Sequence, residues 1–407
     1  MPNIVIVGGG AAGFFAALSA AKAGATDICV LEGSASVLGK VKISGGGRCN
    51  VTHDCDDPRS LVEFYPRGSK ELLGPFHRFG PSDTKAWFES AGVALKTELD
   101  GRVFPQCDRS QSIVNALSQA AEHAGVKVLT QQRVKELEAN ADGSWHLRTR
   151  TDEFQAGCLM VACGSSNALW RELEKLGLSV QPPVPSLFSL NTRDPRLRDL
   201  SGLSLESAEL EVTELGLSAS GPLLITHWGL SGPAALKISA WGARELAACD
   251  YRFELQVNWL AGTSVAAAKA ALQQVRNSQS KKQVSNANPF SIPTRLYLRF
   301  LEACGIDGAK RWAELSGKQA DKLCDMVVSS KLSIRGKSTN KDEFVTAGGV
   351  DLSEIDFRSF RARRVENLYL AGEVLDIDAL TGGFNFQAAW TGGWLAGKAM
   401  AEVVQGN

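Results

Sequence analysis

Three glycines near the start of the chain have the spacing of a dinucleotide-binding turn. Gly8, Gly10 and Gly13 fit G-x-G-x-x-G within Gly8-Gly9-Gly10-Ala11-Ala12-Gly13. The first glycine permits the tight bend, the second lets the backbone approach a pyrophosphate, and the third lets helix and strand pack closely. Backbone N–H groups at the start of the next helix would then face the phosphates, so Ala11 and Ala12 are candidate binding residues as well.

Glu32 follows at the expected spacing for a ribose-binding acid. Its carboxylate would accept hydrogen bonds from adenosine ribose hydroxyls and would repel a 2′-phosphate, which disfavours NADP here. The elements that must position these groups are an apolar strand at 4–7, an Ala-rich helix from 14 to 24 and a second apolar strand at 28–31. A glycine-rich turn in any α/β protein is the alternative reading.

A second glycine run lies between residues 38 and 52. Gly45-Gly46-Gly47 precedes Arg48-Cys49-Asn50, and three consecutive glycines favour neither helix nor strand. We expect a loop whose backbone lies against a flat or charged ligand, with Arg48, Asn50 and Thr52 near it. A flexible surface loop is the alternative.

Two further strands predict the opposite edge of the same site. Residues 158–164 read as an apolar strand that ends on Gly164, and residues 367–373 read as one that ends on Gly372-Glu373. Asp376 and then Thr381-Gly382-Gly383-Phe384-Asn385-Phe386-Gln387 lead into a helix that reaches about residue 403. A flavin needs such an arrangement, because the acid can hold ribityl hydroxyls and the helix N-terminus can stabilise negative charge on the reduced ring. An unrelated strand–turn–helix is the alternative.

Composition limits the remaining classes. The chain has 407 residues, 44 Lys+Arg against 44 Asp+Glu, and nine cysteines. Zero net charge argues against a dedicated nucleic-acid or membrane protein. No apolar run approaches the ~18 residues of a membrane span, and no basic leader precedes the first strand. Scattered cysteines without zinc spacing predict reduced thiols, no metal site and a cytoplasmic location.

The pattern along the chain predicts an interrupted α/β domain. Pro182-Pro183-Val184-Pro185 reads as a linker, residues 186–260 alternate like strands, and residues 264–330 are helical in pattern with a polar break at 277–288. Residues 345–350 mark the return to the first domain.

Together these segments resemble the YhiN-like (BaiN-like) family of FAD-binding flavoproteins, which includes aminoacetone oxidase-like members. The resemblance also covers Gly101-Arg102-Val103-Phe104-Pro105, residues 226–233 and residues 346–350. It implies non-covalent FAD in a two-part, glutathione-reductase-like Rossmann domain at 1–185 and 345–407, with an inserted β-barrel at 186–262 and a helical subdomain at 263–344. The expected cofactor-binding residues are Gly8, Gly10, Ala11, Ala12, Gly13, Glu32, Gly39, Lys40, Ser44, Gly45, Gly46, Arg48, Cys49, Asn50, Val134, Ala162, Cys163, Gly164, Gly372, Glu373, Asp376, Gly382, Gly383, Phe384, Asn385 and Phe386.

The chain departs from the family pattern at three places. Ala162-Cys163-Gly164 stands where Ala-Thr-Gly-Gly is usual, which puts one backbone contact to FAD in doubt. The segment 165–177 is shorter than usual, and His53 stands where Asn is common.

We therefore expect an FAD-dependent oxidoreductase that acts on a small-molecule substrate. Only one dinucleotide fingerprint is present, so the substrate itself, or NAD(P)H docking without its own domain, would reduce the flavin. His227 is the candidate acid/base, with Arg48 and Asn50 beside the flavin, because a free imidazole titrates near neutral pH; a structural histidine in a barrel turn is an equal alternative.

Two other functions stay open at this point. Arg358, Arg361, Arg363 and Arg364 with the Lys-rich helical insert would suit an RNA-modifying or RNA-binding flavoprotein, although zero net charge favours a solvated surface and makes a nucleic-acid partner unlikely. A redox flavoprotein without turnover is the third possibility. Cys49 and Cys55 invite comparison with flavin-linked disulfide reductases, but the β-branched and turn-forming residues between them disfavour the helix that such a pair occupies.

Overall fold

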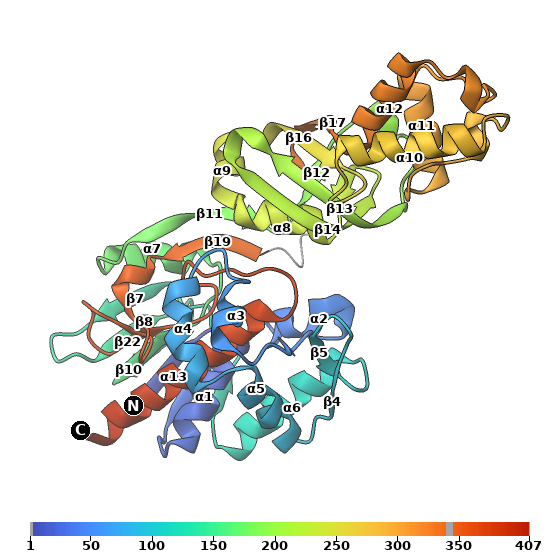
Figure 1. The fold of residues 1–407 in the computed structure, drawn as a ribbon. Helices are drawn as coiled ribbons and strands as arrows, with labels where there is room; N and C mark the ends of the chain where they lie inside the picture. Colours follow the sequence, from blue (N-terminus) through green and yellow to red (C-terminus); the bar gives the residue numbers. More distant parts are fainter. Residues whose placement is uncertain (1–2, 339–344, 407) are drawn as a thin grey trace. The chain divides into compact units, whose positions relative to one another are not determined.

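The computed structural model describes residues 3–338 and 345–406 (Figure 1). The chain forms two compact units, one of Met1–Val184 with Lys341–Asn407 and one of Pro185–Asn340. Residues 339–344, which include the predicted end of the helical subdomain, lie outside the described residues.

The first unit is built on a seven-stranded sheet. Its order is β20-β21-β22-β10-β1-β2-β6, and the five strands from β22 to β6 run parallel. Strands β1, β2, β10 and β22 are buried along their whole length, as a parallel sheet covered on both faces requires. This confirms the predicted α/β class with a Rossmann-type sheet. The strands are β1 (Ile4–Val7), β2 (Ile28–Leu31), β6 (Lys127–Leu129), β10 (Cys158–Val161), β20 (Ile355–Asp356), β21 (Arg361–Ala362) and β22 (Leu368–Leu370).

The first and last helices join the two ends of the chain. α1 (Ala11–Lys22) packs along α13 (Phe384–Gly406) in Figure 1. A Cβ built on Gly393 would lie 2.3 Å from the Ala12 carbonyl oxygen, and one on Gly397 would lie 2.2 Å from that of Ala16. Only glycine at both positions lets the two backbones approach this closely.

Smaller elements complete this unit. β7 (Glu136–Ala139), β8 (Trp145–Arg148) and β9 (Glu153–Ala156) form an antiparallel meander, while β6 pairs in parallel with β2. A three-stranded sheet holds β3 (Thr52–His53), β5 (Arg102–Pro105) and β4 (Leu95–Thr97). The remaining helices are α2 (Gly39–Gly47), α3 (Pro58–Val62), α4 (Ser69–Arg78), α5 (Pro81–Ser90), α6 (Ser110–His123) and α7 (Asn167–Lys175).

One prediction of irregular structure needs correction. The predicted linker 182–185 lies inside a strand, β11 (Val180–Ser186), which pairs with β19 (Val345–Val350) in a two-stranded sheet. Proline fits there because its fixed φ suits an extended chain and a sheet edge needs no N–H donor. The glycine run at 45–47 has the irregular backbone that the sequence predicts: it lies at the end of α2, but Ser44, Gly45 and Gly46 are not helical and all three glycines have positive φ.

The second unit combines a seven-stranded sheet with helices. The sheet order is β17-β16-β13-β14-β15-β12-β18, and one apolar core joins it to helices α10 to α12, which gather at one end of the unit (Figure 1). The division into a barrel at 186–262 and a helical subdomain at 263–344 stays a prediction. The elements are β12 (Ser189–Asn191), β13 (Ser204–Val212), β14 (Leu217–Ile225), β15 (Gly229–Ser231), α8 (Pro233–Trp241), α9 (Ala243–Ala248), β16 (Arg252–Asn258), α10 (Val265–Ser278), α11 (Thr294–Cys304), α12 (Gly317–Val328), β17 (Ser330–Arg335) and β18 (Lys337–Ser338).

Three general features bear on chemistry. All nine cysteines are free thiols. Among the described residues, no cluster of His, Cys, Asp and Glu could hold a metal ion. In the same part of the chain, no helix has the length and apolar character needed to cross a membrane.

Candidate functional site

The three fingerprint glycines meet different constraints. Gly8 has φ +116°, and a Cβ built on it would lie 2.3 Å from the Ala162 carbonyl oxygen. A Cβ on Gly13 would lie 2.0 Å from the Gly8 carbonyl oxygen, so this glycine serves helix–strand packing as predicted. A Cβ on Gly10 would meet no protein atom within 4 Å. The fold therefore leaves the space at Gly10 open, and its role in binding a ligand stays a prediction.

Glu32 is tied to this turn. Its Oε2 accepts a 2.9 Å hydrogen bond from the Gly9 N–H, and its Oε1 accepts two bonds of 2.7 Å from the N–H and hydroxyl of Ser34. The carboxylate is thus fixed at the end of β2, beside the start of α1. It keeps lone pairs for further donors, which is what a ribose-binding acid requires.

The end of β22 approaches the same turn. Gly372 has φ +82°, and a Cβ on it would lie 3.2 Å from the Cβ of Ala12. The Lys40 ammonium forms an ion pair with Oε2 of Glu373. The structure therefore brings together one group of predicted residues around the start of α1: Gly8, Gly10, Ala11, Ala12, Gly13, Glu32, Lys40, Ala162, Gly164, Gly372 and Glu373.

A second group forms around Asn50. Gly45 and Gly46 have φ values of +57° and +67°, and a Cβ on Gly45 would lie 3.2 Å from the Asn50 backbone nitrogen. The Asn50 Oδ1 is buried and has no hydrogen-bond partner among the described residues. An orphaned buried acceptor is costly unless a further donor reaches it. The N–H groups of a flavin ring are donors of the required kind, so Asn50 fits such a group.

Cys49 lies next to Asn50, but its environment disfavours the reactive thiolate form. Its side chain is fully buried, and its backbone N–H donates to the Ser44 carbonyl oxygen at 3.0 Å. Burial raises the pKa of the Cys49 thiol to about 12. A thiol held in the protonated form is a poor nucleophile.

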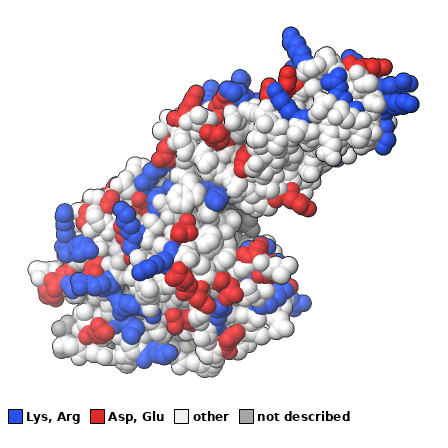
Figure 2. Space-filling model, in the orientation of Figure 1, with Lys and Arg blue, Asp and Glu red and all other residues white. Residues whose placement is uncertain are grey.

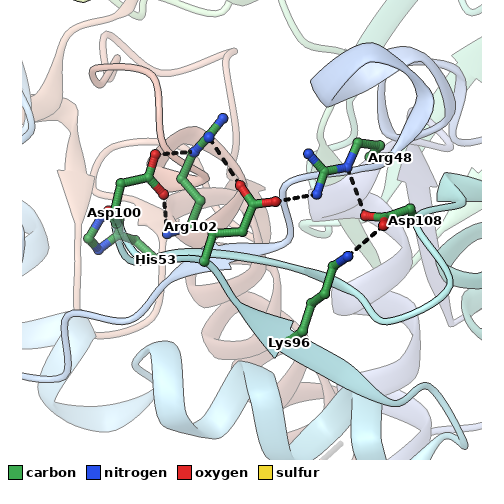
Figure 3. A network of polar contacts seen from close by, with 7 residues as sticks. Arg48, His53, Lys96, Asp100, Arg102 and Asp108 are labelled. Carbon is green, nitrogen blue, oxygen red and sulfur yellow. Dashed lines mark hydrogen bonds and ion pairs between the residues drawn. The ribbon is translucent and has the colours of Figure 1, made fainter. Parts of the chain in front are cut away.

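Arg48 is held by a charged network (Figure 3). Its Nη2 pairs with Glu98, its Nε donates to Asp108 at 2.8 Å, and its guanidinium lies 3.9 Å from the centre of the Phe104 ring. Glu98 also pairs with Arg102 at 3.0 Å, and Asp108 pairs with Lys96. The predicted catalytic role of Arg48 stays a prediction, and the structure adds a positioning role for the segment that leads to Asn50.

The start of α13 packs on this second group. Gly383 has φ +90°, and a Cβ on it would lie 2.6 Å from the carbonyl carbon and oxygen of Thr52. The sequence attributed this glycine to the flavin alone, whereas the close protein neighbour is the Thr52 backbone. The Tyr65 hydroxyl donates to the Phe384 carbonyl oxygen at 2.6 Å.

His53 belongs to an aromatic stack beside that helix end. Its ring lies 4.6 Å from that of Phe384, which lies 4.2 Å from that of Phe64. His53 Nε2 is 3.0 Å from the Asp100 carbonyl oxygen, which assigns the proton to Nε2. Burial is the largest influence on the pKa of His53 and lowers it below 6.5.

The sequence did not predict a buried hydrogen-bond network that is centred on Gln387. Gln387 Oε1 accepts from the Thr52 hydroxyl at 2.6 Å and from the Thr84 hydroxyl at 3.0 Å. Its Nε2 donates to Thr391 Oγ1 at 3.1 Å, and that hydroxyl donates to the Phe79 carbonyl oxygen at 2.8 Å. The network locks α13 to β3 and α5. The one feature of the sequence that could have indicated this network is a polar residue, Gln387, within a largely apolar helix.

The other predicted residues are placed individually. Asn385 Oδ1 and Nδ2 bind the backbone of Ala379, so this side chain shapes the loop before α13. The Asp376 N–H donates to the Val350 carbonyl oxygen at 3.1 Å, and Val134 is buried near the end of β2. Gly39 is the first residue of α2, and Ser44 Oγ donates to the Val41 carbonyl oxygen at 2.9 Å. Cys163 follows β10, and Gly382 precedes α13. The ring of Phe386 stacks on that of Trp390, with 5.5 Å between the ring centres.

His227 lies in the second unit. It stands in the turn between β14 and β15, and its side chain is exposed. Among the described residues it makes no hydrogen bond or ion pair. His227 and the two groups of predicted residues belong to different units, so its acid/base role stays a prediction.

Comparison with known proteins identifies the family. The model of the HI0933-like protein Rossmann domain matches residues 2–399. The chain belongs to the HI0933-like family. This confirms the family resemblance seen in the sequence.

Two curated relatives match almost the whole chain. A 3-dehydro-bile acid delta(4,6)-reductase of Clostridium scindens is 27% identical, with 99% of this chain and all of that protein covered. A ribosomal RNA dihydrouridine synthase of Escherichia coli is 28% identical, with 96% of each covered.

Solved structures support the fold of this HI0933-like chain. A 3-ketosteroid-delta4-(5alpha)-dehydrogenase from Rhodococcus jostii has a TM-score of 0.52 at 14% identity, with 98% of this chain and 96% of that chain covered. A 3-ketosteroid delta1-dehydrogenase from Sterolibacterium denitrificans also has a TM-score of 0.52, at 11% identity, over 98% and 99%. The chain is an FAD-dependent oxidoreductase, as expected from its sequence.

Proposed function

We propose that this chain reduces a carbon–carbon double bond conjugated to a carbonyl group. The observation that carries the proposal is that the two curated relatives are named for reductions of this kind, one of a bile acid and one of uridine. A 3-oxo steroid with a 4,5-double bond and a uracil ring both present an alkene next to a carbonyl. Hydride addition to the β-carbon places negative charge on the carbonyl oxygen, and a proton then reaches the α-carbon.

When bound, FAD in its reduced form would supply the hydride and would itself be oxidised. NAD(P)H is the proposed class of reductant that restores it. The protein's part is to hold and orient the cofactor: the Gly8–Gly13 turn and Glu32 at the adenosine end, and Asn50 with the start of α13 at the ring end. The partly buried start of α13 presents a positive helix end, which favours a reduced, anionic flavin.

His227 is the proposed proton donor. Its exposed imidazole, free of partners among the described residues, supports this assignment. Replacement of His227 by Gln should slow turnover while the anaerobic transfer of hydride from NAD(P)H to FAD continues. Equal turnover in that variant would remove His227 from the mechanism.

A uracil base in RNA is the second candidate substrate, beside a small-molecule enone. The specific observation in its favour is the uneven distribution of charge. Residues 263–338 contain 13 Lys and Arg against 5 Asp and Glu, although the whole chain has 44 Lys and Arg and 44 Asp and Glu.

Free thiols throughout the chain support a reducing compartment, and we place the reaction in the cytoplasm.

Product analysis tests the proposed function. Purified holoenzyme is supplied with NADH or NADPH and with either a 3-oxo-4-ene steroid or a uridine-containing ribosomal RNA fragment. We expect one product class to gain the mass of two hydrogens, and its saturated analogue to be inert. No gain of mass in either class, while NAD(P)H still reduces the flavin, would contradict the proposal.

A further inference from the structure

A group of cations that form no ion pair among the described residues lies in the helical part of the second unit. One of them, Lys310, donates to Gln319 Oε1 at 3.3 Å. Two segments, 280–285 and 308–313, run antiparallel there and are joined by backbone hydrogen bonds. The Val284 N–H donates to the Lys310 carbonyl oxygen at 2.8 Å, and the Trp312 N–H donates to the Lys282 carbonyl oxygen at 3.1 Å. We call Lys281, Lys282, Lys310 and Arg311 the basic strip.

Two buried side chains anchor the segments that carry the basic strip. Val284 and Trp312 are fully buried in the core of this unit, and the Tyr297 hydroxyl donates to the Val284 carbonyl oxygen at 2.9 Å. The bridge between Gln283 and Arg311 brings the two segments side by side, so the four cations lie on adjacent segments of the chain. Lys281, Lys282 and Arg311 are exposed, and Lys310 is half-buried.

No carboxylate neutralises the strip among the described residues. The two acids that flank Lys310 and Arg311 in the sequence accept backbone hydrogen bonds: Glu314 accepts from the Arg311 N–H at 3.1 Å, and Asp307 accepts from the Ala309 N–H at 2.9 Å. Other lysines of the same unit are paired, such as Lys269 with Asp321 and Lys331 with Glu254, both at 2.7 Å. Like charges on neighbouring positions destabilise a fold, which makes an unpaired group informative.

The surroundings of the strip favour a nucleic acid over a lipid surface. Gln283 lies opposite Arg311, and Asn286 and Gln279 flank the paired segments. Amides beside cations suit phosphates, sugars and base edges, whereas membrane-surface segments present large apolar side chains. Here the apolar side chains of Val284 and Trp312 point into the core. Figure 2 shows Lys and Arg gathered at the end of the helical part.

We propose that the basic strip binds the phosphate backbone of an RNA that carries the reducible uracil. This inference rests on the proposed function, because it names the substrate class of the same reductase. The strip supplies affinity and register, and the reaction itself takes place at the flavin.

Binding of a fluorescein-labelled ribosomal RNA hairpin to the holoenzyme tests the strip without turnover. Anisotropy is measured over a series of salt concentrations for three variants: Lys281→Gln with Lys282→Gln, Lys310→Gln with Arg311→Gln, and the control Lys331→Gln with Arg335→Gln. The control removes the same charge from β17 of the same unit. Circular dichroism and thermal unfolding show that each variant is folded, because the mutated residues lie in the second unit and the flavin is held by the first.

We expect each strip variant to bind the hairpin about tenfold more weakly and to lower the salt slope by ~1.4, because two phosphate contacts are lost. The control should keep both values. Unchanged affinity in both strip variants, an equal loss in the control, or binding to phosphatidylserine vesicles in place of RNA would overturn the inference. If RNA does not bind but a steroid enone is reduced, the strip fails while the proposed function stands.

Discussion

The Gly9 N–H donates a 2.9 Å hydrogen bond to Oε2 of Glu32, which ties the nucleotide-binding turn to the acid 23 residues later. The two groups are predicted from separate motifs, and the structure makes them one unit. A ligand that binds the turn therefore meets an acid whose position is already set, so little side-chain entropy is lost on binding.

Removal of the Glu32 carboxylate should weaken FAD binding. Glu32→Ala loses a charged hydrogen-bond acceptor for ribose, worth about 1.5–3 kcal/mol or roughly 10–150-fold in Kd. Fluorescence titration of the apoprotein with FAD measures this. Ser34→Ala is the matched control, since it removes one 2.7 Å bond to Glu32 but keeps the carboxylate. Equal affinities in wild type and Glu32→Ala would show that ribose does not bind here.

Two glycine substitutions should fail for different reasons. The added Cβ of Gly10→Ala meets no protein atom within 4 Å, so the apoprotein of this variant should have the same unfolding temperature as the wild-type apoprotein. Its FAD binding, in contrast, should be lost. Gly383→Val combines a φ of +90° with a Cβ 2.6 Å from the Thr52 backbone, so the apoprotein itself should lose about 2 kcal/mol or more.

Thermal unfolding of both apoproteins, followed by FAD titration, separates the two effects. If Gly10→Ala destabilises the apoprotein as much as Gly383→Val, the open position at Gly10 is a property of the fold and not of a ligand site.

Gln387 should be a stability residue rather than a redox residue. Gln387→Leu leaves the buried hydroxyls of Thr52 and Thr84 without an acceptor, at a cost of about 1–3 kcal/mol. Chemical denaturation measures the loss, and Gln111→Leu on the exposed face of α6 serves as control. A Gln387→Leu protein of wild-type stability would contradict the network.

His53 should make stability depend on pH. Its native pKa is lowered, chiefly by burial, so the unfolded chain takes up a proton first as the pH falls. The stabilisation is complete above the unfolded value of about 6.5 and is lost as the pH falls through the lower native value. His53→Phe keeps an aromatic ring in the stack but cannot titrate. The free energy of unfolding should fall more steeply for wild type than for this variant below about pH 6.5, and parallel curves would exclude His53 as the cause.

Local motifs predicted the backbone of the glycine-rich turn. Gly13 packs against Gly8, and Glu32 accepts from the Gly9 N–H, because a βαβ unit is built from residues close in sequence. Nucleotide binding by these residues stays a prediction. Contacts between distant segments were less visible. The Arg48 ion pairs and the Thr52–Gln387 bond join residues 50 to 335 positions apart, and no periodicity records such partners.

Charge shows the same limit. The zero net charge of the chain argued against nucleic acid, yet it conceals an excess of Lys and Arg in residues 263–338. A net value averages over the whole surface, whereas binding depends on local groups such as the basic strip. Likewise, Pro182–Pro185 marks the boundary between the two units but is extended strand rather than free linker.

The most direct test of the proposed reductase is an anaerobic reoxidation. Holoenzyme reduced with one equivalent of dithionite is mixed with a 3-oxo-4-ene steroid or with a uridine-containing ribosomal RNA fragment, and the visible absorbance of FAD is followed. Reduction of a conjugated double bond predicts that oxidised flavin returns at a rate that rises with substrate concentration, and that the saturated steroid or dihydrouridine RNA has no effect. Flavin that stays reduced with both substrates, yet reoxidises at once with oxygen, would contradict it.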